Sequence, residues 1–431
     1  MKRYLESIGF FLFFFFLISA TVCAAETDEY GYPFTNPYEA SILSTPINLR
    51  APLPEKIRVK NLELIVFPDR MVPDVFWYNN KFYYSLAAQK KKAPLIFIIA
   101  GTGARYDSPK AQTMQRAFFQ AGFHVICLSS PTHPNFIAAA SSSGFPGDIR
   151  SDARDLYHVM KLAWEEARQS IEVSDFYLAG YSLGASQSAF ISLVDDGKKV
   201  FNFKKILMIN PALSLYDSAI RIDHMLADNI PGGMDHFDDF YRKLMHNISD
   251  IYKYGEFVDL NFGFFYQALN KVLPTPEEQK AVIGFSFRMS AANMIFVSDV
   301  INHTGWIVPK ETILTRYSSL TDYSKIAGRT SGFGFYIENM LLPAFKKDHP
   351  GITLAQLVEQ SSLRSIEDYL KNAPKIGLMT NEDDFILATG DVDYLKEIFG
   401  ARAKIYPRGG HCGNMEYKDN VAYMIDYFNS R

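Results

Sequence analysis

One stretch near the middle of the chain limits what it can fold into. An apolar strand, Phe176–Ala179, runs into the pentapeptide Gly180-Tyr-Ser-Leu-Gly184, and a helix-compatible run follows as far as Val194. A G-x-S-x-G turn between a strand and a helix lifts the serine hydroxyl out of the fold, and only glycine fits two residues before and after it. The helix N-terminus offers N–H groups to an anionic intermediate. Ser182 is therefore our candidate nucleophile, against the plainer interpretation of an incidental serine in a β-turn-α connection.

The apolar runs around this turn predict the fold class. Runs at 94–100, 123–129 and 204–211 have the continuous apolar character of strands that are buried on both faces. Segments with helical periodicity separate them, and the same rhythm resumes with runs at 375–380 and 403–407. Strands that alternate with helices predict an α/β fold, with a mostly parallel sheet and helices on both of its faces.

A long insertion interrupts this rhythm. We assign 57–213 and 372–431 to the two parts of the α/β core, and 214–371 to a helical insertion between them. The insertion has no convincing strand run and is crowded with aromatic and Met side chains: Phe257, Phe262, Phe264, Phe265, Tyr266, Phe285, Phe287, Met289, Met294, Phe296, Phe333, Phe335 and Met340.

The residues before the core predict little regular structure. Residues 26–56 contain five prolines and show neither helix nor strand periodicity, so we expect an extended segment. The alternating run at 57–67 predicts a strand, and 75–85 predicts a hairpin that turns at Asn79-Asn80.

The first 25 residues have the pattern of a secretory signal. A basic start precedes an apolar run, and small residues stand at the spacing of a cleavage site before polar Glu26. We therefore expect residues 1–25 to be removed and the protein to be exported, to a periplasm or the medium. An uncleaved membrane anchor and a lipid-modified Cys23 are the alternatives. After cleavage only Cys127 and Cys412 remain, and we expect both to be reduced.

Charge excludes one class of partner. The net charge is −3, and there is no basic stripe or Arg-rich tail, so we expect no nucleic-acid partner. A membrane enters the interpretation only as the source of a lipid ester or through an uncleaved N-terminal anchor.

A serine nucleophile needs a base, and the base needs an orienting carboxylate. We choose His411 as the base, because it follows the last strand and glycines on both sides free its ring to reach another loop. His133, also at the carboxyl end of a strand, is the alternative base, and a loop residue without a role is the plainer interpretation of His411.

Three adjacent carboxylates follow the strand at 375–380 and are candidates for the orienting acid. We favour Asp384, because the apolar Phe385-Ile-Leu387 after it would anchor the loop, and we keep Asp383 and Glu382 as alternatives. A solvated acidic turn is the plainer interpretation.

Two backbone N–H groups are candidates for holding an oxyanion. One belongs to Leu183, directly after the nucleophile, and the other to Thr102, in the turn Gly101-Thr-Gly103 after an earlier strand.

In this order, Ser182, Asp384 and His411 resemble the catalytic residues of the α/β-hydrolase superfamily. The resemblance covers about 57–213 and 372–431, and members of the superfamily commonly carry a variable cap where this chain has its insertion. Many members begin the oxyanion turn with His-Gly, where this chain has Ala100-Gly101. The resemblance implies an α/β-hydrolase fold with a large helical cap.

The resemblance also implies a serine hydrolase that cleaves carboxylic esters of small molecules or lipids, and the expected signal segment makes it an exported one. A serine peptidase, a thioesterase and a binding protein that has lost the chemistry are the alternatives. The chemistry requires no cofactor. The segment Asp235–Asp239 has the residues of a metal site, but it suits a solvated helix face better, and we expect no metal.

Overall fold

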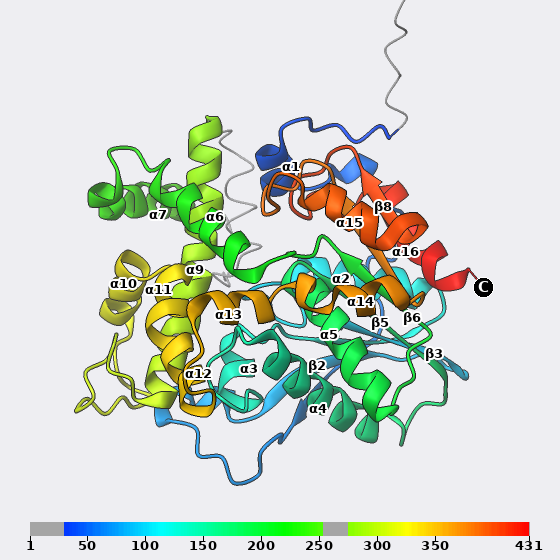
Figure 1. Cartoon of the computed structure of the whole chain (residues 1–431), viewed down its shortest axis with the longest axis horizontal. Helices are drawn as coiled ribbons and strands as arrows, with labels where there is room; N and C mark the ends of the chain where they lie inside the picture. The colour runs from blue at the N-terminus through cyan, green and yellow to red at the C-terminus, as the bar shows by residue number, and fades with distance from the viewer. Residues whose placement is uncertain (1–29, 253–274, 431) are drawn as a thin grey trace, which may run out of the picture. The chain divides into compact units, whose positions relative to one another are not determined.

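The computed structural model describes residues 30–252 and 275–430 (Figure 1). The chain divides into two units, Met1–Gly31 and Tyr32–Arg431, and the sheet and its helices belong to the second. The expected signal segment and five of the aromatic residues named for the insertion, at positions 257, 262, 264, 265 and 266, lie outside the described residues.

A single eight-stranded sheet forms the centre of the described fold. Its strand order is β1-β2-β4-β3-β5-β6-β7-β8, antiparallel in the β1-β2 and β2-β4 pairs and parallel from β4 to β8. The expectation of a mostly parallel sheet is confirmed. The strands are β1 (Val59–Leu64), β2 (Phe82–Ala87), β3 (Ala93–Ile99), β4 (His124–Leu128), β5 (Val173–Tyr181), β6 (Lys205–Ile209), β7 (Ile376–Asn381) and β8 (Ala403–Tyr406).

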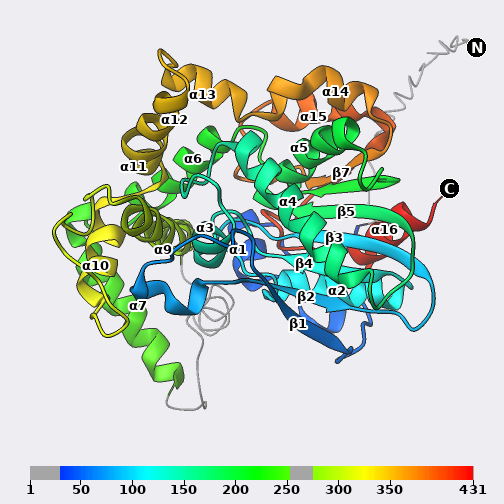
Figure 2. The same ribbon diagram turned by 90° about the horizontal axis from the view of Figure 1, so that it is seen from below.

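Helices cover both faces of this sheet, as the parallel strands require (Figure 2). Helices α4 (Ile149–Ala167) and α5 (Leu183–Lys198) pack together on one face, and α2 (Pro109–Gln120) packs with α16 (Lys418–Asn429) on the other. The side chain of Ser192 in α5 bonds to Tyr369 of α14 (Glu367–Asn372), which places α14 on the α5 side.

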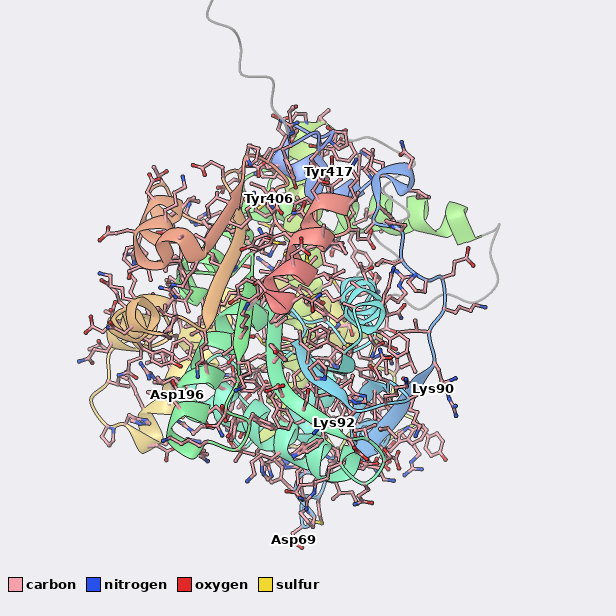
Figure 3. All side chains as sticks on the ribbon, turned by 90° about the vertical axis from the view of Figure 1, so that its right-hand side faces the viewer. Asp69, Lys90, Lys92, Asp196, Tyr406 and Tyr417 are labelled. Carbon is pink, nitrogen blue, oxygen red and sulfur yellow. The ribbon has the colours of Figure 1, made fainter. Side chains whose placement is uncertain are left out.

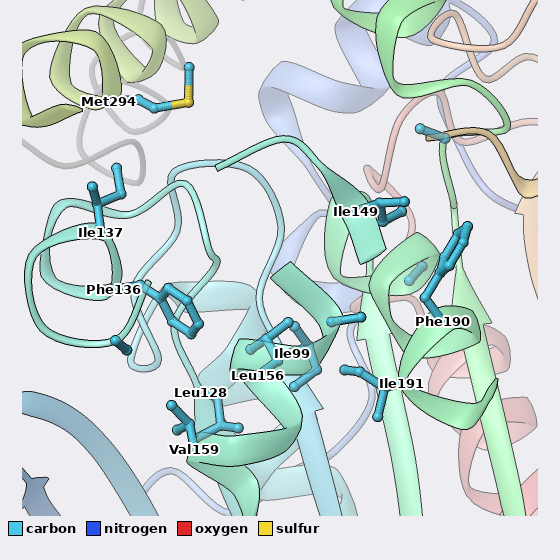
Figure 4. Close-up of a cluster of buried hydrophobic side chains, with 14 of the residues drawn as sticks. Ile99, Leu128, Phe136, Ile137, Ile149, Leu156, Val159, Phe190, Ile191 and Met294 are labelled. Carbon is cyan, nitrogen blue, oxygen red and sulfur yellow. The ribbon is translucent and has the colours of Figure 1, made fainter. Parts of the chain in front are cut away.

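The main core fills the space between the sheet and its helices. Ile99 and Leu128 of the strands are fully buried against Leu156 and Val159 of α4 and Ile191 of α5 (Figure 4). Burial of each such side chain contributes roughly 1.5–3 kcal/mol. The core therefore holds rigid the sheet edge from which the loops of the candidate site extend.

The named elements between β6 and β7 in the described residues are all helices or helical turns. Most of them gather at the left of Figure 1, whereas α14 lies beside α5. These elements are α6 (Leu215–Ala227), a 3-10 turn (Met234–His236), α7 (Phe237–Tyr252), α9 (Pro276–Asn302), α10 (Thr321–Thr330), α11 (Phe333–Tyr336), a π-helical turn (Ile337–Leu341), α12 (Leu342–Asp348), α13 (Leu354–Gln360), a 3-10 turn (Leu363–Ile366) and α14. Of the described helices, α9 alone is long and apolar enough to span a membrane, and most of its apolar stretch is buried within the protein.

The expectation of an extended segment at 26–56 is wrong for residues 37–49. Residues Pro37–Leu43 form helix α1, and Ile47–Leu49 form a 3-10 turn. The Asn36 side chain caps α1 by accepting the N–H groups of Tyr38 and Glu39. A helix of seven residues is too short to be stable alone, so packing against the rest of the protein holds it, and the local sequence shows no clear period.

The expectation of a hairpin at 75–85 is also wrong. Residues Asp74–Asn79 form a 3-10 helix, and β2 begins only at Phe82. The Phe76 ring is buried and packs edge-on against Phe296 of α9 with ring centroids 5.8 Å apart. A contact with the insertion therefore decides the structure here.

Helix α15 (Asp391–Phe399) and a 3-10 turn (Gly400–Arg402) connect β7 to β8. Helix α3 (Pro134–Ala139) follows β4, and His133 caps it. The loops after β3, β5, β6, β7 and β8 all leave from the carboxyl edge of the sheet, where the residues of the candidate site come together.

Candidate active site

Ser182 lies in a strained turn between β5 and α5. Its φ is +55°, in the left-handed region, and its N–H donates to the carbonyl oxygen of Ile209 at 2.9 Å. A Cβ on Gly180 would overlap the Gly184 carbonyl oxygen, and one on Gly184 would overlap that of Ile99. Only glycine fits at these two positions, as the pentapeptide predicts, and the turn holds the serine at the sheet edge.

The structure brings His411 between Ser182 and Asp384. His411 Nε2 is 2.9 Å from Ser182 Oγ, and Nδ1 is 3.0 Å and 3.1 Å from the two carboxylate oxygens of Asp384. With the ring protonated at Nδ1, His411 donates to Asp384 and accepts from the serine hydroxyl. All three side chains are buried, so water competes little for these bonds.

The three adjacent acids after β7 have different surroundings. Asp384 faces His411, whereas the Asp383 carboxylate accepts the backbone N–H groups of Gly409 and Gly410 at 3.2 Å and 2.8 Å. Glu382 is paired with Lys396 at 3.0 Å near the surface. Asp383 therefore holds the loop that carries His411, and Asp384 alone of the three contacts the imidazole.

Asn210 is a residue of the site that sequence reasoning missed. It follows β6 directly, with φ +48°, and its Nδ2 donates to Asp384 Oδ2 at 2.8 Å. The other carboxylate oxygen accepts the Ile386 N–H at 3.3 Å. Asn210 could have been found as a polar residue at the carboxyl end of β6, because β6 is the neighbour of β7, the strand that precedes Asp384.

The charge of Asp384 governs the imidazole. Burial lowers the pKa of His411, but the charge of Asp384 and its hydrogen bond to the ring raise it, as does Cys412, and the net shift is upward, to about 10. His133, the alternative base, accepts the Asn135 N–H at 3.1 Å and caps α3. Burial, helped by the charge of Arg105, lowers the pKa of His133 to about 4.

Two backbone N–H groups beside Ser182, those of Thr102 and Leu183, are the candidates that could donate to an oxyanion. In the turn after β3, the Gly103 N–H donates to Thr132 Oγ1 at 2.8 Å and the Ala104 N–H to the Gly101 carbonyl, which leaves Thr102. Leu183 is the first residue of α5, and a residue at that position has no acceptor within its own helix. Thr102 and Leu183 both line one cavity with Ser182.

Two cavities share Ser182 and His411 in their walls. The larger, of about 340 Å³, is bounded by residues 101–105 and 107–110 and by part of the segment before β1, including Ser41–Ser44 and Arg50. The smaller, of about 100 Å³, lies against the insertion. Its wall is mostly apolar and includes Leu215, Ala219, Ile222, Phe287, Met294, Phe333, Ile337, Leu341, Leu357 and Ile386.

The described residues contain no group of three His, Cys, Asp or Glu side chains placed to hold a metal ion. In the segment 235–239, His236 and Arg242 both pair with Asp239 on an exposed surface. Cys127 and Cys412 are both buried free thiols.

The sheet order, the strained serine turn and the loop positions together define an α/β-hydrolase fold. Solved structures that this chain is similar to include a thioesterase domain from the curacin biosynthetic pathway, with a TM-score of 0.39, 12% identity, and 86% of this chain and 100% of that chain covered. A structure from an analysis of two fungal esterases from Rhizomucor miehei gives a TM-score of 0.42 at 12% identity, covering 86% of this chain and 84% of that chain. A hyperthermophilic esterase from the archaeon Pyrobaculum calidifontis gives 0.39 at 15% identity, covering 87% and 84%.

No family model matches the sequence, and the search of curated proteins finds no match.

Proposed function

We propose that the protein is an exported serine hydrolase that cleaves carboxylic esters through an acyl-enzyme. The observation that carries this proposal is the hydrogen-bond chain from Ser182 Oγ through His411 to Asp384, with distances of 2.9 Å and 3.0 Å. A serine hydroxyl becomes a nucleophile at neutral pH when a base of this kind takes its proton.

The proposed reaction has two halves. Ser182 Oγ attacks the ester carbonyl carbon while its proton passes to His411 Nε2, and Asp384 stabilises the imidazolium that forms. The N–H groups of Thr102 and Leu183 hold the oxyanion. When the tetrahedral intermediate collapses, the C–O bond to the alcohol breaks and His411 protonates the leaving oxygen. A water then attacks the acyl-enzyme by the same steps and releases the acid.

The smaller cavity favours an apolar acyl group. It opens beside Ser182 and the two N–H donors, and its wall is mostly apolar. Two polar side chains of the wall are already paired, since Ser218 donates to the Ile386 carbonyl at 2.8 Å and Tyr336 donates to the Pro146 carbonyl at 2.8 Å. A polar acyl group would lose its hydrogen bonds to water there and find few partners in the wall. Fatty or other apolar acyl esters, including those of lipids, are therefore the substrates we favour.

Three alternatives share parts of this site. Thioester and peptide hydrolysis use the same nucleophile, base and acid. A binding protein that has lost the chemistry would be expected to lack one of the three residues, whereas here all three are in contact.

The test compares p-nitrophenyl esters, matched acyl thioesters and chromogenic peptides on the native protein and on Ser182→Ala. We expect ester hydrolysis to fall by on the order of 10³-fold or more in the variant, because the three residues act as a unit. Ester hydrolysis that survives in a folded Ser182→Ala protein contradicts the proposal. Peptides cleaved faster than esters support the peptidase.

A further inference from the structure

The segment before β1 packs against the loop that carries His411. We call residues 32–51 the amino-terminal clamp and residues 407–417 the His411 loop. Arg408 Nε donates to the Tyr32 carbonyl at 2.6 Å, and the Ala51 N–H donates to the Glu416 carbonyl at 3.0 Å. Arg50 pairs with Tyr417 as an isolated β-bridge, and Figure 3 labels Tyr417 where the chain leads into α16. The amino-terminal clamp therefore contacts the His411 loop near both ends of the loop, at Arg408 and at Glu416.

Ser41 of α1 bonds directly to the backbone of His411. The His411 N–H donates to Ser41 Oγ at 2.8 Å, and the Ser41 hydroxyl donates to the Pro37 carbonyl at 2.7 Å. Since the Ser41 proton is directed to Pro37, a lone pair of its oxygen faces the His411 N–H. Ser41 is buried at the wall of the larger cavity, and its oxygen is the acceptor that fixes the His411 N–H.

Glycines bring the two backbones into contact on either side of His411. A Cβ on Gly410, where φ is +56°, would overlap the Pro37 carbonyl oxygen, and a Cβ on Gly413 would overlap the Ala40 carbonyl oxygen. Thr45 Oγ1 adds a bond to the Gly413 carbonyl at 3.2 Å. A loop this rich in glycine has much conformational freedom when unsupported, and α1 restricts it.

The clamp also reaches the imidazole ring through one intermediate. Tyr38 of α1 stacks on Phe385 with centroids 5.3 Å apart, and Phe385 lies edge-on to the His411 ring at 6.0 Å. Asn36, which caps the N-terminus of α1, donates from Nδ2 to the side chain of Gln279 in α9 at 3.1 Å. Helix α1 is thus held by the insertion while it holds the histidine.

We propose that the amino-terminal clamp is a positioning element for His411, and that Ser41 is its central positioning residue. This inference rests on the proposed function. The base must stay within hydrogen-bond reach of Ser182, and a misplacement of about 1 Å can cost on the order of 100-fold in rate. The clamp removes the freedom that the glycines of the His411 loop would otherwise allow.

The test compares Ser41→Ala with Ser41→Cys and with the matched control Ser192→Ala. Ser192 is also a fully buried serine with a hydrogen bond to another group, Tyr369, but it lies in α5 and lines neither cavity. We expect Ser41→Ala to lower kcat and the rate of fluorophosphonate labelling by about 10-fold with KM nearly unchanged. Ser41→Cys, a weaker acceptor, should fall between, and Ser192→Ala should stay near the native rates. If Ser41→Ala does not fold, the Cys variant carries the comparison.

A second readout does not depend on activity. The downfield proton signal of His411 Nδ1–H, assigned by its loss in His411→Gln, should broaden or shift in Ser41→Ala and not in Ser192→Ala. An unchanged signal, or rates in the Ser41 variants equal to those of Ser192→Ala, overturns the positioning role. If the native protein neither hydrolyses esters nor reacts with the probe while the signal still responds to Ser41, the proposed function fails and the positioning role stands.

Discussion

Asn210 donates a hydrogen bond from Nδ2 to Asp384 Oδ2 at 2.8 Å, across the gap between the ends of two neighbouring strands. The backbone N–H of Asn210 also donates to the Met379 carbonyl at 2.7 Å. This bond fixes the backbone of Asn210 to β7, the strand that precedes Asp384. Together with the Ile386 N–H, the Asn210 side chain leaves the carboxylate in one orientation, facing His411 Nδ1. This support distinguishes Asp384 from the acids beside it.

The three acids should therefore respond differently to loss of charge. Asp384→Asn cannot hold the imidazole in its working tautomer, and a loss of about 10⁴-fold in kcat is the measured effect in another serine hydrolase. Asp383→Asn should lose less, because its carboxylate acts on the backbone of the His411 loop. Glu382→Gln should stay close to the native rate, because it loses only a surface ion pair. An inactive Asp383→Asn beside an active Asp384→Asn would reverse the assignment.

The pH profile reports the shift at His411. Only the neutral imidazole can accept the serine proton, and the Asp384 charge moves the pKa of His411 upward. As the pH falls, kcat/KM should therefore decline with a midpoint above the ordinary value of about 6.5.

Asp384→Asn provides the control for this profile. With the carboxylate charge gone, burial weighs more heavily and should move the midpoint of the remaining activity, or of fluorophosphonate labelling, below that of the native protein. A native midpoint at or below 6.5, or one that the substitution does not lower, contradicts this interpretation.

The sequence predicted those parts of the site that local rules determine. The turn around Ser182 follows from two glycines that no other residue can replace, and the sheet follows from apolar runs of strand length. Helix α1 escaped prediction because its stability comes from contacts with the His411 loop, far away in sequence. Asn210 escaped because its role depends on β6 and β7 being neighbours, and about 165 residues separate those strands in the chain.

Acyl length tests the smaller cavity. In the native protein, kcat/KM should rise as the acyl chain grows from two carbons towards eight, with at most about 0.8 kcal/mol for each methylene buried. Ala219→Phe, which places a ring in this cavity, should remove the gain for longer chains and leave acetate esters hydrolysed. Ala227→Phe, on the same helix but in the wall of neither cavity, is the control. If kcat/KM of the native protein does not change with acyl length, or is highest for acetate esters, the substrates are small polar esters or peptides instead.

The amino-terminal sequence predicts where the mature chain begins. Cleavage of the expected signal should leave an N-terminus at Ala25 or Glu26, before Tyr32, whose carbonyl accepts from Arg408. Intact-mass measurement of protein from the fractionated native host, in the periplasm or medium, checks this. A full-length chain in the membrane fraction would support the anchor instead.

Covalent labelling tests the central claim most directly. The native protein is treated with a fluorophosphonate probe, and the adduct is counted by intact mass and located by peptide mapping. We predict one adduct per chain, on Ser182. Labelling should be slowed by about 10³-fold in His411→Gln. It should be absent in Ser182→Ala, provided that this variant has the same unfolding temperature as the native protein. An adduct that persists in Ser182→Ala, or that maps to another residue, would contradict the assignment of Ser182 as the nucleophile.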